Sequence, residues 1–125
     1  MLFRSKLYGT HVGCEHGVCG ACTMRFNGAI VRGCLMLAVQ GDGARVETIE
    51  GLSDTGEIAD LQRAFAERNA LQCGFCTPGM IMTAADLAAA GGQPTDDEIR
   101  HALEGNLCRC TGYENIVRAI REAVS

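Results

Sequence analysis

The sequence predicts an α+β chain, in which a small β-rich unit is followed by a wholly helical one. Residues 23–26 and 29–32 alternate in hydrophobicity around an Asn-Gly turn, which is the strongest short hairpin signal. From Ile58 onward, apolar residues recur at helical spacing instead. The eight cysteines fall into two groups of four, one in each unit. We therefore expect two units, each built around four thiols.

Composition limits the classes of function that are open to the chain. A net charge of −4 gives no basic footprint, so nucleic acid is not an expected partner. No apolar run reaches the roughly 20 residues of a membrane span, and the first residues lack the apolar core of a signal peptide. The expected location is the cytoplasm, where thiols stay reduced. Eight cysteines there indicate metal ligands rather than disulfides.

The first segments are a helix end and a loop. Leu2, Phe3 and Leu7 have the spacing of the last turns of a helix, which Gly9 would end. Residues 10–22 are rich in glycine and cysteine and are expected to form a loop.

Short strands and a boundary follow this loop. The hairpin over 23–26 and 29–32 would deliver Cys34, and a further strand is expected over 46–49. Residues 51–57 have the composition of a loop and mark the boundary between two domains. The predicted domains are residues 1–51 and residues 57–125.

Four helices are expected after this boundary, each with an apolar stripe. Thr95 and Glu98 form a capping box, and Thr77 and Thr111, each directly after a cysteine, are expected N-caps. The order helix, cysteine pair, threonine, helix occurs twice, which indicates a four-helix unit. The inward-facing residues would be Ile58, Leu61 and Phe65; Met80, Ile81, Ala84, Leu87 and Ala88; Ile99, Ala102 and Leu103; and Ile116, Val117, Ile120 and Val124.

The first group of cysteines has the spacing of plant-type [2Fe–2S] ferredoxins, Cys-x4-Cys-x2-Cys followed by a distant fourth. Such a loop must wrap over the bridging sulfides, and glycines between the ligands remove the Cβ atoms that would block this approach. They also leave backbone N–H groups free to donate to sulfur. The spacing therefore predicts an iron–sulfur site at Cys14, Cys19, Cys22 and Cys34.

The second group is less specific. Its two pairs, Cys-x2-Cys and Cys-x-Cys, are also typical of zinc sites, so taken alone it fits zinc as well as iron. A disulfide framework is disfavoured, because no secretory signal is recognised. Both pairs would lie near helix N-termini, which favour thiolates and an anionic cluster. The members of this group are Cys73, Cys76, Cys108 and Cys110.

Other polar residues near the cysteines have less specific roles. His11 and His16 flank Cys14, but the cysteine set is already complete, so they are expected to be loop residues rather than ligands. Gln72 directly precedes Cys73, where the sequence alone suggests only a polar residue at the end of a helix.

Three long motifs occur in order along the chain. They are residues 13–23 (Gly-Cys-Glu-His-Gly-Val-Cys-Gly-Ala-Cys-Thr), 71–80 (Leu-Gln-Cys-Gly-Phe-Cys-Thr-Pro-Gly-Met) and 105–113 (Gly-Asn-Leu-Cys-Arg-Cys-Thr-Gly-Tyr). Together they closely resemble the small iron–sulfur subunit of the molybdenum hydroxylases, the relatives of xanthine dehydrogenase, aldehyde oxidoreductase and aerobic carbon monoxide dehydrogenase. The resemblance covers nearly the whole chain.

The resemblance implies two [2Fe–2S] clusters. One would be held by Cys14, Cys19, Cys22 and Cys34 in an N-terminal ferredoxin-like β-grasp domain, residues 1–51. The other would be held by Cys73, Cys76, Cys108 and Cys110 in a C-terminal four-helix domain, residues 57–125. This assignment replaces zinc at the second site.

The resemblance also implies partners. The helical cluster would lie nearest the molybdopterin of a large catalytic subunit, with Gln72 and Cys110 touching the pterin. The ferredoxin-like cluster would face a FAD-binding subunit. Electrons released when substrate is hydroxylated at molybdenum would pass along this line. The chain would then be the electron-transfer subunit of a cytoplasmic, hetero-oligomeric oxidoreductase, without a substrate-converting residue of its own.

The chain departs from the family pattern at its start, where relatives carry a β-hairpin and most of a helix before the position of Leu2. The β-grasp sheet is therefore expected to lack its first hairpin and to expose an edge and core surface. All eight cysteine ligands remain, so the cluster chemistry is expected to be kept.

Two other functions are compatible with parts of the sequence. A zinc-stabilised adaptor or binding module would explain the second cysteine group but not the ferredoxin-type loop. A free-standing ferredoxin would explain the loop, but the two-domain layout argues against it. This sequence does not predict the substrate of the expected complex, because the pocket of the large subunit selects it.

Overall fold

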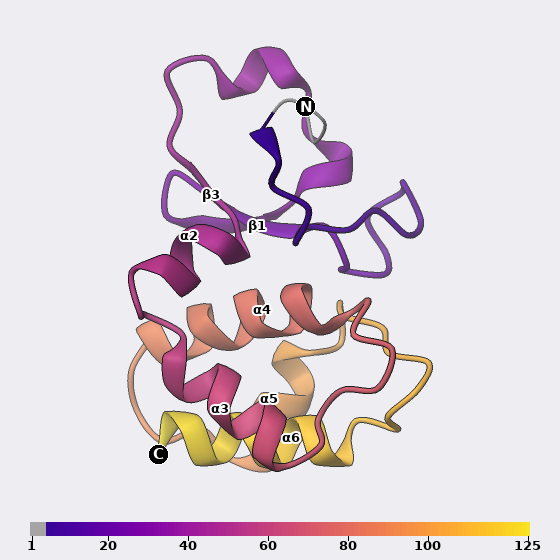
Figure 1. Cartoon of the computed structure of the whole chain (residues 1–125), viewed down its shortest axis with the longest axis vertical. Helices are drawn as coiled ribbons and strands as arrows, with labels where there is room; N and C mark the ends of the chain where they lie inside the picture. The colour runs from indigo at the N-terminus through magenta and orange to yellow at the C-terminus, as the bar shows by residue number, and fades with distance from the viewer. Residues whose placement is uncertain (1–4) are drawn as a thin grey trace.

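The structure is a computed structural model that describes residues 5–125. Figure 1 shows the strands at one end of the molecule and most of the helices at the other. Between them lies α4 (Thr77–Ala89), which contacts both the sheet and several of the other helices. The chain is thus arranged in layers around one central helix. The other main helices are α3 (Ala59–Glu67), α5 (Asp96–Ala102) and α6 (Glu114–Val124).

The strands form a small antiparallel sheet in the order β2-β1-β3. They are β1 (Thr23–Phe26), β2 (Ala29–Arg32) and β3 (Val46–Glu47). Asn27 and Gly28 join β1 to β2 with φ angles of 48° and 87°, the left-handed conformations that a two-residue hairpin turn needs. The predicted hairpin is therefore confirmed. Cys34 follows β2 in the short 3-10 helix η1 (Gly33–Leu35), and a second such helix, η2, spans Ala38–Gly41.

The region between sheet and helices differs from the prediction. The strand expected over 46–49 ends at Glu47, and the loop expected over 51–57 is largely replaced by helix α2 (Ile49–Asp54). The reason is Leu52, which is only 1% exposed and packs into the helical core. Burial of Leu52 stabilises a helix here, although the residues around it have the composition of a loop. The local sequence does not reveal this, because burial of Leu52 depends on distant helices.

The helical half contains the four predicted helices around one core. Helix α4 is buried over consecutive residues from Gly79 to Ala85, because the sheet covers one side and the helices the other. The single stripe predicted for α4 was therefore too narrow, and Ala88, predicted to face inward, is exposed. The core cluster includes Leu52, Ile58, Leu61, Phe65, Met80, Met82, Ile99, Leu103, Ile116, Val117 and Ile120.

The helix starts agree with the prediction in one case of three. The capping box of α5 is present, with Glu98 N donating to Thr95 Oγ1. Thr77 is not a cap but the first residue of α4, and its buried hydroxyl has no hydrogen-bond partner within the described residues. Thr111 is not a cap either, because α6 begins at Glu114 after Tyr113, whose φ is 70°. Thr111 contributes to a cysteine loop instead, because its hydroxyl donates to Cys108 Sγ.

The N-terminal helix was predicted partly on Leu2 and Phe3, which lie outside the described residues. Leu7 is not helical, and Lys6 rather than Gly9 has a left-handed φ, of 59°. The helix prediction is therefore wrong for Leu7. Beside this segment, the sheet face is hollowed by a cavity of about 400 Å³ with a mainly apolar lining.

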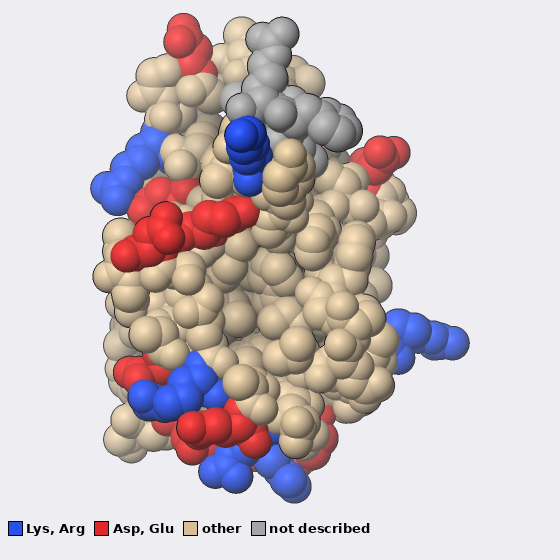
Figure 2. Space-filling model, in the orientation of Figure 1, with Lys and Arg blue, Asp and Glu red and all other residues tan. Residues whose placement is uncertain are grey.

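None of the helices in residues 5–125 is long and apolar enough to cross a membrane. Figure 2 shows acidic and basic side chains side by side over the helical end of one face, without a broad basic patch there. The ion pairs Arg68–Glu122 and Arg121–Asp96 belong to this mixed surface of the helices.

Helix α4 approaches the loop before β1 so closely that only glycine fits at position 79. A Cβ there would overlap with the carbonyl oxygen of Gly20. Gly79→Ala is therefore expected to lower the free energy of unfolding by about 1–3 kcal/mol in urea denaturation. Gly51→Ala is the matched control, because Gly51 also lies in a helix but has no neighbour within 4 Å. It should stabilise the protein by up to about 1 kcal/mol. Equal effects of the two substitutions would contradict this packing.

Candidate metal centres

The loop over 10–22 and the turn after β2 bring the first four cysteines together. The backbone N–H of Cys19 donates to Cys14 Sγ at 3.4 Å. Cys22 precedes β1 and Cys34 follows β2, and pairing of these strands places Gly33 N 3.1 Å from Cys22 O. Burial, then a hydrogen bond with Cys22 and the charges of Cys22 and Cys14, raise the pKa of the Cys34 thiol. The predicted first set therefore meets at one place.

Backbone N–H groups of the loop surround the Cys14 sulfur. Those of Cys19, His16 and Val18 lower the pKa of the Cys14 thiol from 9.0 to about 6. Gly17 lies between His16 and Val18 and has a φ of 81°, a left-handed conformation that glycine tolerates. Such a concave set of donors binds anions. It suits a thiolate, and equally the sulfur of a bound cluster.

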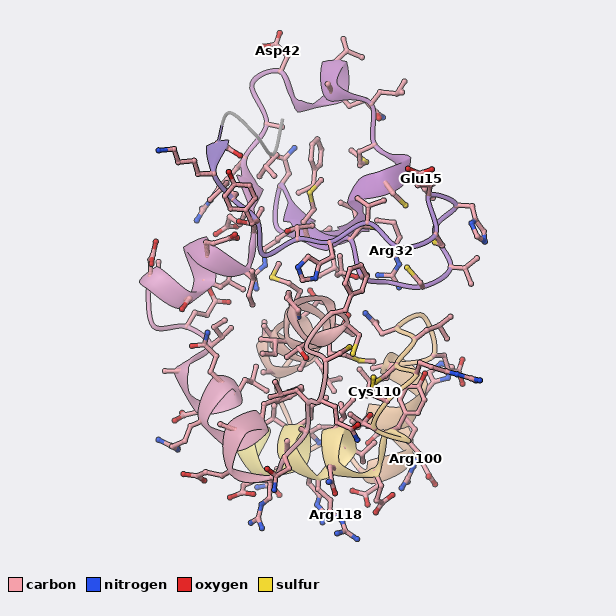
Figure 3. The ribbon with its side chains drawn as sticks, turned by 45° about the vertical axis from the view of Figure 1, so that its right-hand side comes forward. Glu15, Arg32, Asp42, Arg100, Cys110 and Arg118 are labelled. Atoms are coloured by element: carbon pink, nitrogen blue, oxygen red, sulfur yellow. The ribbon has the colours of Figure 1, made fainter. Side chains whose placement is uncertain are left out.

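The second four cysteines meet as two pairs. The Sγ atoms of Cys73 and Cys110 lie 3.5 Å apart, and both residues are exposed. Cys76 and Cys108 are half-buried, and their thiols share a hydrogen bond. Each pair takes one cysteine from the loop before α4 and one from the loop before α6, where Figure 3 labels Cys110. This site therefore forms only when both loops are in place.

The two thiols of the half-buried pair, Cys76 and Cys108, have pKa values that are shifted in opposite directions. Burial and the hydrogen bond with Cys108 raise the pKa of the Cys76 thiol to about 12. Burial also opposes ionisation of Cys108, but the Thr111 hydroxyl donates to Cys108 Sγ at 3.1 Å, and the pKa of Cys108 is lowered overall. Thr111 thus forms a hydrogen bond with a thiol, whereas the sequence predicted that it would be a helix N-cap.

The thiol pairs of the second site can be compared with the geometry of metal ligands. Sulfurs bound to one tetrahedral metal at about 2.3 Å lie roughly 3.8 Å apart. The Cys73–Cys110 separation of 3.5 Å is close to this value, so these two thiols could share one metal ion. Two such pairs fit a [2Fe–2S] cluster, in which each iron takes two thiolates.

Main-chain contacts join the two groups of cysteines. The N–H of Leu107, which directly precedes a cysteine of the second group, donates to Cys19 O at 2.8 Å. Asn106 is 2% exposed, donates to Gly20 O at 3.3 Å and accepts from Thr83 of α4 at 2.9 Å. These hydrogen bonds thus connect the neighbourhoods of the two sites. The sequence did not predict this role of Asn106, because it shows only a polar residue just before the ligand loop.

The histidines of the first loop contact backbone carbonyl groups. His16 Nδ1 lies 2.6 Å from Cys14 O. The ring of His11 stacks on Phe75 with centroids 4.6 Å apart, and its Nδ1 lies 2.8 Å from Phe75 O. Phe75 stands between two cysteines of the second group, so His11 attaches the first loop to the second site. The expectation that both are loop residues agrees with these contacts, but it did not foresee the stacking.

Gln72 and Cys110, the two residues expected to contact a pterin, lie together. Gln72 Nε2 donates to Cys110 O at 3.0 Å, and both residues are exposed. Gln72 does not end a helix, because α3 ends at Glu67. It lies in the loop that leads to Cys73, where its amide forms part of the outer surface of the second site.

Comparison with known proteins identifies the fold and the family. Residues 48–121 match the family described as [2Fe–2S] binding domain. The chain is 57% identical over 118 residues to the nicotine 6-hydroxylase small subunit of Paenarthrobacter nicotinovorans, which covers 94% of this chain and 71% of that protein. It is 45% identical over 122 residues to the xanthine dehydrogenase iron–sulfur-binding subunit of Escherichia coli O157:H7, covering 96% and 77%. Among solved structures, quinoline 2-oxidoreductase from Pseudomonas putida 86 matches with a TM-score of 0.91 at 51% identity, over 98% of this chain and 78% of that one.

In the cluster-free protein, iodoacetamide is expected to alkylate Cys14 much faster than Cys76 at pH 7. Thiolates react and thiols do not. A pKa of about 6 leaves Cys14 mostly ionised at this pH, whereas a pKa of about 12 keeps Cys76 neutral. Labelling of Cys14 should fall as the pH is lowered through about 6. Peptide mass spectrometry after brief exposure measures both rates, with urea-unfolded protein as the control in which the difference disappears. Faster labelling of Cys76 would refute the proposed role of the loop N–H groups.

Proposed function

Because this chain belongs to the family of small iron–sulfur subunits of the molybdenum hydroxylases, we propose that it is the electron-transfer subunit of such an enzyme. The observation that carries the proposal is the hydrogen bond from Leu107 N to Cys19 O, 2.8 Å long, which joins two groups of four cysteines. Electrons from the molybdopterin of a large subunit would pass through this chain toward a FAD-binding subunit or another acceptor.

The ligand assignment follows the two groups of thiols. Clusters of the [2Fe–2S] type are the cofactors of this family, and they supply one-electron redox chemistry. We assign the first cluster to the N-terminal domain, residues 1–51, and the second to the helical domain, residues 57–125. The proposed ligands are Cys14, Cys19, Cys22 and Cys34 for the first, and Cys73, Cys76, Cys108 and Cys110 for the second.

The residues around the thiols hold them in place and tune them. The loop N–H groups at Cys14 and the Thr111 hydroxyl at Cys108 both donate to sulfur. Hydrogen bonds to sulfur make an added electron less costly and so raise a reduction potential. Burial of Cys22 and of the pair Cys76 and Cys108 limits access of water to the inner sides of the sites. We assign no substrate-converting role to any residue of this chain.

The exposed contact between Gln72 and Cys110 is the face that we propose for the large molybdopterin subunit. The neighbouring side chains Leu71, Phe75 and Leu107 are apolar and exposed. Apolar residues at the centre of a patch, with a polar group that orients the partner, are typical of a protein interface. The first site would then face the FAD-binding subunit. The relatives are described as subunits, which supports membership of a complex.

The two alternative functions, a zinc-stabilised adaptor and a free-standing ferredoxin, each explain fewer of these observations. A zinc-stabilised adaptor does not require the ferredoxin-type loop, and the family that matches residues 48–121 is a [2Fe–2S] binding domain. A free-standing ferredoxin would not explain why the pair Cys73 and Cys110 is exposed at the surface. The expected cytoplasmic location agrees with the need for reduced thiols.

Metal analysis and one substitution test the assignment. The purified chain should contain about four iron atoms and about four acid-labile sulfides, as two [2Fe–2S] clusters require. Cys110→Ser should lose about half of the iron, since a hydroxyl is a poor ligand for iron in a thiolate site. In the complex, it should stop reduction of the acceptor by substrate. Arg109→Gln is the control, because this exposed neighbour is not a proposed ligand. One or two zinc ions without visible absorbance would exclude the proposal.

A second substitution tests the proposed partner face. Gln72→Leu keeps the size of the side chain but removes the amide that donates to Cys110 O. Iron content should not change, whereas the rate of cluster reduction by substrate in the complex should fall about tenfold, as expected for one lost hydrogen bond. Gln62→Leu is the matched control, because Gln62 is an exposed residue of α3 whose amide donates to Ser53. If both variants are reduced at the same rate in stopped-flow measurements, the partner face lies elsewhere.

A further inference from the structure

Arg32 lies at the junction of the two candidate sites. Its Nη1 donates to Thr23 Oγ1 at 2.6 Å, and its Nη2 donates to Gly105 O at 2.8 Å. Thr23 directly follows Cys22, whereas Gly105 belongs to the loop that leads to Cys108. Figure 3 shows the Arg32 side chain between the sheet and the helical layer. One guanidinium therefore bridges the two loops that carry the proposed ligands.

The surroundings hold this guanidinium in one position. Thr23 is 2% exposed and its hydroxyl donates to Gly20 O at 2.6 Å, so its oxygen is oriented to accept from Arg32. Gly105 leaves the space that the guanidinium needs, because a Cβ there would overlap with Arg32 Nη2. The planar fork of an arginine suits two acceptors on different segments. Arg32 is thus a half-buried charge fixed at both ends.

Within residues 5–125, no carboxylate lies within ion-pair distance of Arg32. Arg25 and Arg121, by contrast, bind Glu57 and Asp96 at 2.8 Å. A charge taken partly out of water without an opposite charge nearby is unfavourable. The acidic groups nearest along the chain are thiols of the proposed ligands, one residue from Thr23 and two from Arg32.

We propose that Arg32 is a fixed countercharge for both iron–sulfur sites and raises their reduction potentials. The proposal rests on the ligand assignment made above. Four thiolates leave a [2Fe–2S] centre anionic, and an added electron makes it more so. A cation held between two such sites stabilises the reduced state of each and weakens their mutual repulsion. The effect is larger at the first site, because Arg32 adjoins the segments of both Cys22 and Cys34.

Potentiometric EPR of the intact complex tests this role. Arg32→Gln should lower the ratio of reduced to oxidised first cluster at a fixed potential about tenfold, a shift of about 59 mV to more negative values. Arg32→Lys keeps the charge but loses the forked hydrogen bonds, so it should change that ratio less than about twofold while lowering the melting temperature. Arg45→Gln is the matched control, because it removes the same charge from an exposed pair with Glu47, beside the hairpin turn at Asn27. It should leave the potential unchanged.

Iron and sulfide content are measured first in every protein. A wild-type chain without iron would refute the ligand assignment itself. Full iron content with an unchanged potential in Arg32→Gln would overturn only the role of Arg32, as would equal shifts in Arg32→Gln and Arg32→Lys. If Arg32→Gln does not assemble its clusters, Arg32→Lys still decides the question, because a tenfold shift with the charge retained is incompatible with a countercharge.

Discussion

Close backbone contact between the first cysteine loop and the loop before α6 is the constraint on which the rest of the structure depends. Leu107 N donates directly to Cys19 O, and a Cβ at Gly20 would overlap with Gly105 O. A Cβ at Gly79 of α4 would overlap with the carbonyl oxygen of Gly20. Backbones approach so closely only where side chains are absent. The two loops are therefore positioned by rigid main chain rather than by flexible side chains, and so are the thiols that they carry.

Close packing of the loops has opposite effects on the protonation of the thiols. Burial favours neutral sulfur, as the pKa of about 12 at Cys76 shows, whereas a cluster needs thiolates. Around other thiols the fold supplies donors that favour ionisation, namely the loop N–H groups at Cys14 and the hydroxyl of Thr111 at Cys108. Cys76 itself lies at the N-cap of α4. If Cys76 is a ligand as proposed, a metal would replace its proton, and cluster binding would be coupled to completion of this part of the fold.

Sequence reasoning succeeded where the determining interactions are local and failed where they are distant. The turn at Asn27 and the capping box at Thr95 depend on residues a few positions apart, so both were predictable. Helix α2 depends on burial of Leu52 against distant helices, and the bond of Thr111 to a thiol depends on how a loop closes. Spacing grouped the eight cysteines as the structure brings them together, but only the folded chain pairs Cys73 with Cys110.

Exposure differs across the sites in a way that gives the proposed electron path a direction. Cys73 and Cys110 are exposed at the surface, whereas Cys108 is half-buried beside the bond from Leu107 to Cys19. An exposed pair of thiolates is open to oxidation unless another surface covers it. A partner surface on the outer side of the second site would provide such a cover, while the inner side of that site contacts the first cysteine loop. In the proposed path, electrons that enter from the partner would continue toward the first site through this contact, which the glycines make possible.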